Sequence, residues 1–183
     1  MPNWCFNTLI ITGNEKDLLA LKEKAQGDKE EEEYGVMRKT LLDFNKFLPY
    51  PAEFKERDDL CHKYREYKGE FCVDKRKFSI KEEKELLAEI IKRGEDYFQT
   101  DGYNLGGYDW CSANWGTKWN ACQTSCHMID RTLTYTFDTA WAPPLGVLTE
   151  MSKQFPDLKM KLMAETEGYG REGKYNITFK GGK

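Results

Sequence analysis

The sequence has little of three features on which common activities depend: histidine, long apolar runs and net charge. Its two histidines, His62 and His127, leave few candidates for imidazole catalysis or metal binding. It has no run of about 18 apolar residues, which excludes a conventional transmembrane helix. The amino terminus lacks the basic and apolar segments of a secretory signal peptide. We therefore expect a cytoplasmic protein with no membrane partner.

The small net charge limits the partners that electrostatics alone would attract. The formal net charge is −3, and the half from Asp101 onward carries nine acidic and nine basic side chains. Such a chain has no domain-wide attraction for phosphate backbones or anionic lipid. Nucleic acid is thus disfavoured as a partner and would require a local basic patch. The best such cluster is Lys75, Arg76 and Lys77.

The six cysteines are expected to be reduced thiols that pack as small apolar side chains, because disulfides are rare in a cytoplasm. The Cys and His clusters near Cys61 and Cys126 lack the paired short spacings of a structural zinc site. Neighbouring Cys and His side chains on a strand also diverge, which argues against a nucleophile and base pair. We predict no catalytic residue, no metal, no cofactor and no enzymatic activity.

Hydrophobic periodicity divides the amino-terminal part of the chain. Residues 4–12 alternate loosely and are rich in aromatic and β-branched side chains, which predicts a strand. From Glu15 the apolar residues recur at helical spacing, which predicts a helix that ends at Gly27. The acidic run at 28–33 has no apolar periodicity and is predicted to be a solvated loop. Residues 40–54 combine apolar side chains with two prolines that argue against a regular element past Leu48, and are predicted to form a short strand or turn and an apolar plug.

Alternating patterns return in the carboxy-terminal part of the chain. Residues 115–122 (WGTKWNAC) and 131–141 are predicted to be paired strands, the second with Leu133, Tyr135 and Phe137 on one face. A helix is predicted within 142–156, where two prolines precede apolar residues at helical spacing. Two further strands, at 158–165 and 174–180, are predicted to form a second hairpin.

The middle of the chain is highly charged and differs from both ends. Its clearest segment, SIKEEKELLAEIIKRG, has a serine N-cap signal and a terminal glycine, which predicts an amphipathic helix. We predict a mainly helical insertion at about 53–100 within a single domain that spans 1–183. Without it, the order of elements is that of the ferredoxin-like split βαβ plan. The predicted fold class is α+β: a ferredoxin-like sheet with two helices, an extra carboxy-terminal strand and the insertion.

Five segments in this order carry a family resemblance: MPNWCFNTLIITG, FLPYP, WGTKWNA, FDTAWAPP and FPDL with AETEG. On these segments the chain resembles the phage- and plasmid-borne YubB-type family of ferredoxin-like domains. The resemblance covers about residues 1–52 and 100–183, and implies the same fold in a protein of a mobile genetic element. It implies no activity. Where the family pattern usually reads TAWSPP, Ala142 replaces serine, which weakens any role for a hydroxyl there.

Tryptophan is concentrated in one short motif, NWGTKWNA. In the predicted strand its two tryptophans share one face, and Lys118 and Asn120 share the other. The ferredoxin-like plan places Trp4 and Trp141 near the ends of two adjacent central strands. Two interpretations remain open: a buried structural cluster of indoles, or a surface that recognises a partner. The candidate partner-binding residues are Asn3, Trp4, Asn7, Trp115, Lys118, Trp119, Asn120 and Trp141.

Together these patterns favour a non-enzymatic binding protein of a phage, prophage or plasmid. We expect its partner to be a host protein or a small signalling molecule in the cytoplasm of a bacterial host, as for an inhibitor of host defence. The alternative is a nucleic-acid-binding accessory protein that uses a local basic patch. A third class, a small enzyme, would require a pocket with a perturbed carboxylate or thiol.

Overall fold

A computed structural model describes residues 3–27, 30–33, 36–69, 78–168 and 170–183. The chain divides into two compact units. The sheet unit comprises Met1–Pro49 and Trp110–Lys183, and the helical unit comprises Tyr50–Asp109. The helical unit therefore includes the segment for which the sequence predicts an insertion.

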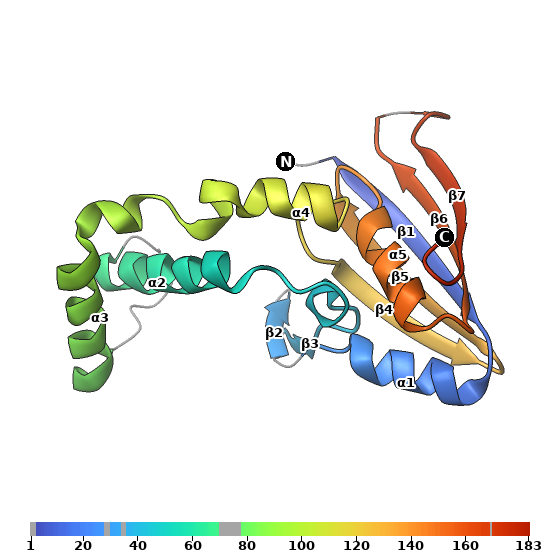
Figure 1. Ribbon diagram of the computed structural model, residues 1–183, viewed down its shortest axis with the longest axis horizontal. Coiled ribbons are helices and arrows are strands. Elements are labelled where there is room, and N and C mark those ends of the chain that lie inside the picture. Colours follow the sequence, from blue (N-terminus) through green and yellow to red (C-terminus); the bar gives the residue numbers. More distant parts are fainter. Residues whose placement is uncertain (1–2, 28–29, 34–35, 70–77, 169) are drawn as a thin grey trace. The chain divides into compact units, whose positions relative to one another are not determined.

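A five-stranded antiparallel sheet forms the centre of the sheet unit, with the strand order β4-β5-β1-β6-β7 (Figure 1). The strands are β1 (Trp4–Thr12), β4 (Cys122–Ile129), β5 (Thr132–Ala140), β6 (Lys159–Thr166) and β7 (Lys174–Phe179). Two helices, α1 (Glu15–Ala25) and α5 (Leu145–Gln154), follow β1 and β5. This order is the ferredoxin-like plan with one added terminal strand, which confirms the predicted fold class.

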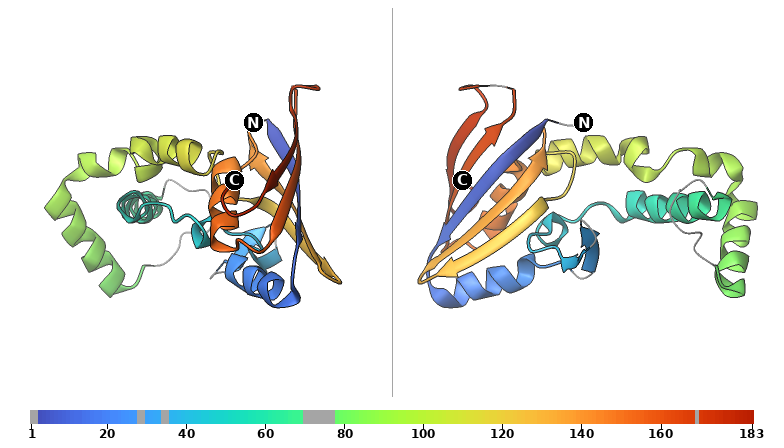
Figure 2. Two further views of the ribbon diagram at one scale, coloured as in Figure 1. Left: turned by 45° about the vertical axis from the view of Figure 1, so that its right-hand side comes forward. Right: turned by 180° about the vertical axis from the view of Figure 1, so that it is seen from behind.

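Buried and exposed side chains alternate along the strands, so the sheet has one buried face and one exposed face. Leu133, Tyr135 and Phe137 are at most 2% exposed, which confirms the predicted inward face of β5. Helices α1 and α5 cover this face and bury their own apolar side chains against it. In the rear view of Figure 2 the strands lie in front of both helices, so the second face is turned away from them. We call this second face, which carries Phe6 and Met163, the outer face.

Local signals explain where the two helices begin and end. The Asn14 side chain accepts a hydrogen bond from the Asp17 backbone N–H (2.9 Å) and so caps α1. Helix α1 ends at Ala25, with Gln26 as its C-cap in place of the predicted Gly27. Two prolines precede α5. Proline is favourable there because backbone N–H groups in the first turn of a helix make no intrahelical hydrogen bond, so its missing N–H costs nothing. Both predicted helices are confirmed.

The acidic segment is not the loop that its composition predicts. Glu30–Glu33 forms β2, which pairs antiparallel with β3 (Val36–Lys39) in a separate two-stranded sheet. The register places Glu30 opposite Lys39 and Glu31 opposite Arg38. The loop prediction is wrong for residues 30–33, because a short strand paired with its neighbour in the chain need not show apolar periodicity. Residues 28–29 of the predicted loop lie outside the described part of the chain.

Residues 115–121 do not form the predicted strand either, and pairing with β5 begins only at Cys122. Gly116 has a φ of +87°, a left-handed backbone conformation that turns the chain. The Asn120 side-chain carbonyl accepts a hydrogen bond from the Phe44 backbone N–H at 2.9 Å. The strand prediction is wrong because this segment bonds to positions outside the sheet, which an alternating pattern does not reveal.

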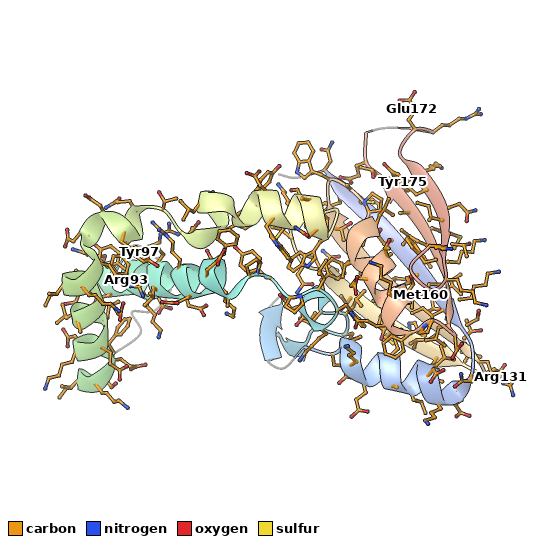
Figure 3. The ribbon with its side chains drawn as sticks, viewed as in Figure 1. Arg93, Tyr97, Arg131, Met160, Glu172 and Tyr175 are labelled. Carbon is orange, nitrogen blue, oxygen red and sulfur yellow. The ribbon has the colours of Figure 1, made fainter. Side chains whose placement is uncertain are left out.

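The helical unit has its own small core, formed by Cys61, Tyr64, Leu86 and Phe98. Its helices include α2 (Ala52–Lys68) and α3 (Ile80–Arg93). Helix α4 (Tyr108–Asn114) begins at the end of this unit, and most of its residues belong to the sheet unit. Helix α3 begins at a capping box between Ser79 and Glu82, which confirms the helix predicted there. Arg93 lies over the ring of Tyr97, 4.7 Å from its centroid (Figure 3). Among the described residues, no helix is long and apolar enough to cross a membrane.

Candidate functional site

Two tryptophans from distant parts of the chain meet at one end of the sheet. Trp4 is the first residue of β1, and Trp119 belongs to the loop that precedes β4. Their ring centroids are 6.2 Å apart, with the rings tilted by 55°. Trp141 follows β5 and is tied to the chain before β1, because its backbone N–H donates to the Asn3 carbonyl at 2.9 Å. The antiparallel pairing of β5 with β1 on one side and with β4 on the other brings these three tryptophan-bearing segments together.

A lysine ammonium group lies against two of these indoles. The Nζ atom of Lys118 is 4.3 Å from the ring centroid of Trp119 and 5.3 Å from that of Trp141. Both distances fall within the range of a cation–π interaction. Trp119 is 37% exposed and Trp141 is 50% exposed, so the group lies at the surface. We call Trp4, Lys118, Trp119 and Trp141 the surface tryptophan cluster.

Backbone strain accompanies this cluster. Trp141 has a φ of +75°, a left-handed conformation that a bulky residue rarely adopts. Such a conformation costs free energy and persists only where the surrounding contacts determine it. Strained backbone also concentrates at binding and catalytic sites. The half-exposed indole of Trp141 is therefore held in place at a cost in stability.

Trp115 lies apart from the surface tryptophan cluster. It is only 4% exposed, and its ring packs edge-on against Phe44 and Trp110, each at a centroid distance of 5.7 Å. Its indole N–H donates to the Leu48 carbonyl at 2.8 Å. The expectation that Trp115 and Trp119 share one face of a strand is wrong. One of these tryptophans belongs to the core and the other to the surface.

The three candidate asparagines also differ in their positions. Asn7 is 3% exposed, and its amide donates to the Cys5 and Phe137 carbonyls and to the Thr139 hydroxyl. Asn120 is partly buried, and its amide donates to the Asp43 carboxylate at 2.8 Å. Asn3 lies beside the surface tryptophan cluster through the hydrogen bond that its carbonyl accepts from Trp141. Asn120 follows Trp119 in the chain, but its side chain is bonded to Asp43 and Phe44.

The outer face also carries a feature that the sequence analysis missed. A wide depression of about 820 Å³ crosses the face beside β1 and is lined in part by Phe6, Asp138, Met163 and Glu165. The register of β1 places Phe6 directly opposite Asp138 on β5 and opposite Glu165 on β6. An aromatic residue between two carboxylates on adjacent strands is visible in the sequence only once the strand order is known.

Asp138 is the electrostatically unusual group in this depression. Partial burial raises the pKa of its carboxyl, and the nearby charge of Glu167 raises that pKa further. The Asp138 carboxylate forms no hydrogen bond or ion pair with any residue that the structure describes. By contrast, Glu165 lies 3.3 Å from the Lys174 ammonium group. The Asp138 carboxyl is therefore a partly desolvated acid that lacks a side-chain partner among the described residues.

Replacement of this carboxylate should stabilise the protein at neutral pH. Because the pKa of Asp138 is raised in the folded state, its contribution to stability is present at low pH and is lost as the pH rises through the folded-state pKa. We expect Asp138→Asn to raise Tm at pH 7 by about 1–2 °C. The gain should shrink as the pH falls toward the unfolded-state pKa of about 3.9.

Thermal unfolding of wild type and Asp138→Asn at pH 7 and pH 4 measures this effect. Asp157→Asn is the matched control, because Asp157 is an exposed acid that precedes the far end of β6. A lower Tm for Asp138→Asn than for wild type at pH 7 would contradict the assignment of Asp138 as an unpaired charge.

The other reactive groups offer less chemistry. Burial raises the pKa values of the thiols of Cys5, Cys61 and Cys126, which lowers the fraction of nucleophilic thiolate. Within the described ranges, no group of three His, Cys, Asp or Glu side chains is arranged to hold a metal ion. The depression on the outer face presents aromatic, aliphatic, carboxylate, hydroxyl and ammonium groups, among them Phe6, Met163, Asp138, Thr136 and Lys174.

The sheet order and the two covering helices define an α+β protein with a ferredoxin-like core. Comparison with known families agrees, because residues 114–182 match the family model described as a ferredoxin-like domain in Api92-like protein. A crystal structure of protein Api92 from Yersinia pseudotuberculosis has a similar fold, with a TM-score of 0.56 and 10% sequence identity. The similarity covers 100% of this chain and 95% of that one. No curated protein matches the sequence.

Proposed function

We propose that this protein is a non-enzymatic binding protein that contacts its partner through the surface tryptophan cluster. The exposure of two fixed indoles is the observation that carries the proposal. Trp119 and Trp141 remain 37% and 50% exposed although Lys118 and the strained backbone hold them in place. Tryptophan is enriched among the residues that dominate the free energy of protein interfaces. Preorganised indoles also lose little conformational entropy on binding.

Asp138 is the feature that an enzyme would need, because it is a carboxyl with a raised pKa in a depression. General acid–base catalysis places such a group within hydrogen-bond reach of a reacting atom, and often pairs it with a second acid, base or nucleophile. Asp138 lies in a wide, open depression and has no hydrogen-bonded partner among the described residues. This arrangement favours recognition of a cation over catalysis.

The cellular setting belongs to the same proposal. The resemblance to the YubB-type family supports a protein of a phage, prophage or plasmid that acts in a bacterial cytoplasm. Such a protein meets host macromolecules as its partners. We propose a host protein as the target, with modulation of a host function or of host defence as the consequence.

Affinity capture from a host lysate tests the tryptophan surface. We expect Trp119→Ala and Trp141→Ala each to reduce the captured partner at least about tenfold, as for central interface tryptophans. The matched controls are His127→Ala and Ile129→Ala. Both residues are exposed on β4, toward the strand end that lies away from the surface tryptophan cluster. Undiminished capture by both tryptophan variants, with their folds intact by circular dichroism, would refute the proposed surface.

Nucleic-acid binding through Lys75, Arg76 and Lys77 is the alternative from the sequence, and these residues lie outside the described part of the chain. Salt dependence separates the two functions. Binding to phosphates weakens steeply between about 50 and 200 mM salt, whereas an interface built on indoles does not. We expect the captured partner to remain bound across that range.

A further inference from the structure

We infer that the depression on the outer face binds an arginine-bearing segment of the partner protein. This inference rests on the proposed binding function and names the chemistry that the partner must present. The depression lies next to the surface tryptophan cluster, because Trp4 and Phe6 are alternate residues of β1 and point to the same face. One partner surface can therefore contact both regions.

The floor of the depression is apolar and accessible. Phe6 is 48% exposed and Met163 is 39% exposed, although both belong to central strands of the sheet. Large apolar side chains exposed together commonly mark an interaction site. An arginine side chain suits this floor because its aliphatic part covers apolar surface and its planar guanidinium stacks on an aromatic ring.

The charges around that floor require a cation. Glu165 already pairs with Lys174 at 3.3 Å, and the Glu167 carboxylate accepts a hydrogen bond from the Trp4 backbone N–H at 3.0 Å. Asp138, across from Phe6 on the other neighbouring strand, has no such partner among the described residues. A guanidinium group above Phe6 would form an ion pair with this carboxylate. Its charge-assisted hydrogen bonds would replace those to the water that the carboxylate lost on partial burial.

The same charges argue against the other classes of occupant. The carboxylates of Asp138, Glu165 and Glu167 would repel a phosphate backbone, so the depression does not suit nucleic acid. A small free cation would leave the exposed floor of Phe6 and Met163 uncovered. An arginine within a protein segment satisfies both the apolar floor and the unpaired carboxylate.

Two synthetic peptides test this inference against the full-length protein. The probes are acetyl-Leu-Arg-Leu-Arg-Leu-amide and its counterpart with glutamate in place of arginine, followed by two-dimensional NMR of the labelled protein. We expect the arginine peptide to shift the amide signals of Phe6, Asp138 and Met163, and the glutamate peptide to leave them unchanged. Asp138→Asn should weaken binding of the arginine peptide about fivefold, the effect of one partly exposed charge pair.

Asp157→Asn, which removes the same charge outside the depression, should bind the arginine peptide like wild type. Equal binding of the two peptides, or equal affinity of wild type and Asp138→Asn, would overturn the inference. If partner capture depends on Trp119 and Trp141 while the arginine peptide fails to bind, the inference falls and the proposed function stands. Intact peptide binding with undiminished capture by the tryptophan variants would instead overturn the proposed function and leave arginine binding supported.

Discussion

Trp115→Ala should lower the free energy of unfolding by about 3–5 kcal/mol, the usual cost of truncating a buried aromatic side chain to alanine. Trp115 is 4% exposed and packs edge-on against Phe44 and Trp110. Removal of the indole leaves a cavity. The Leu48 carbonyl also loses the hydrogen bond that the indole N–H donates to it at 2.8 Å. Urea denaturation of wild type and variant measures the difference.

Trp119→Ala is the matched control for this result. It removes the same side chain from a position that is 37% exposed. We expect it to cost only about 1 kcal/mol, because part of that indole remains in water in the folded state. Equal losses for the two variants would contradict the assignment of Trp115 to the core and Trp119 to the surface.

Asn7→Ala should cost about 2–3 kcal/mol, although it removes a polar side chain from a strand. The amide of Asn7 is buried and donates to the carbonyls of Cys5 and Phe137 and to the Thr139 hydroxyl. Without it, these buried acceptors lose a donor in a place that water does not reach. Denaturant titration monitored by tryptophan fluorescence measures the change.

Asn176→Ala provides the comparison, because Asn176 is exposed on β7. A surface change of this kind is expected to alter stability by no more than about 0.5 kcal/mol. If Asn7→Ala proved as mild as Asn176→Ala, the hydrogen-bond network around Asn7 would not stabilise the sheet as described.

The fold was largely predictable because strand and helix periodicities report directly on burial. The alternation of Leu133, Tyr135 and Phe137 and the helical spacing within α5 both correspond to side chains that now lie in the core. Predictions failed where other forces set the backbone. Backbone pairing with Val36–Lys39 makes Glu30–Glu33 a strand without any apolar alternation, and side-chain hydrogen bonds replace a strand at residues 115–121.

The candidate site was predicted less completely, for two physical reasons. Composition identified the tryptophans, but the burial of Trp115 depends on Phe44, which lies far away in the sequence. The depression was missed because it arises from register. Phe6 and Asp138 are 132 positions apart in the chain, and only the pairing of β1 with β5 makes them neighbours. Long-range pairing of this kind leaves no local pattern to recognise.

The convergence of distant segments on the surface tryptophan cluster is the central structural claim, and nuclear Overhauser spectroscopy of the labelled protein tests it most directly. Lys118 Nζ lies 4.3 Å from the Trp119 ring centroid and 5.3 Å from that of Trp141. The account predicts cross-peaks from the Lys118 methylene protons next to Nζ to the ring protons of both indoles. Because Lys118 and Trp119 are adjacent in the chain, the cross-peak to Trp141 is the decisive one. Its absence would contradict the account, and the proposed binding surface would fall with it.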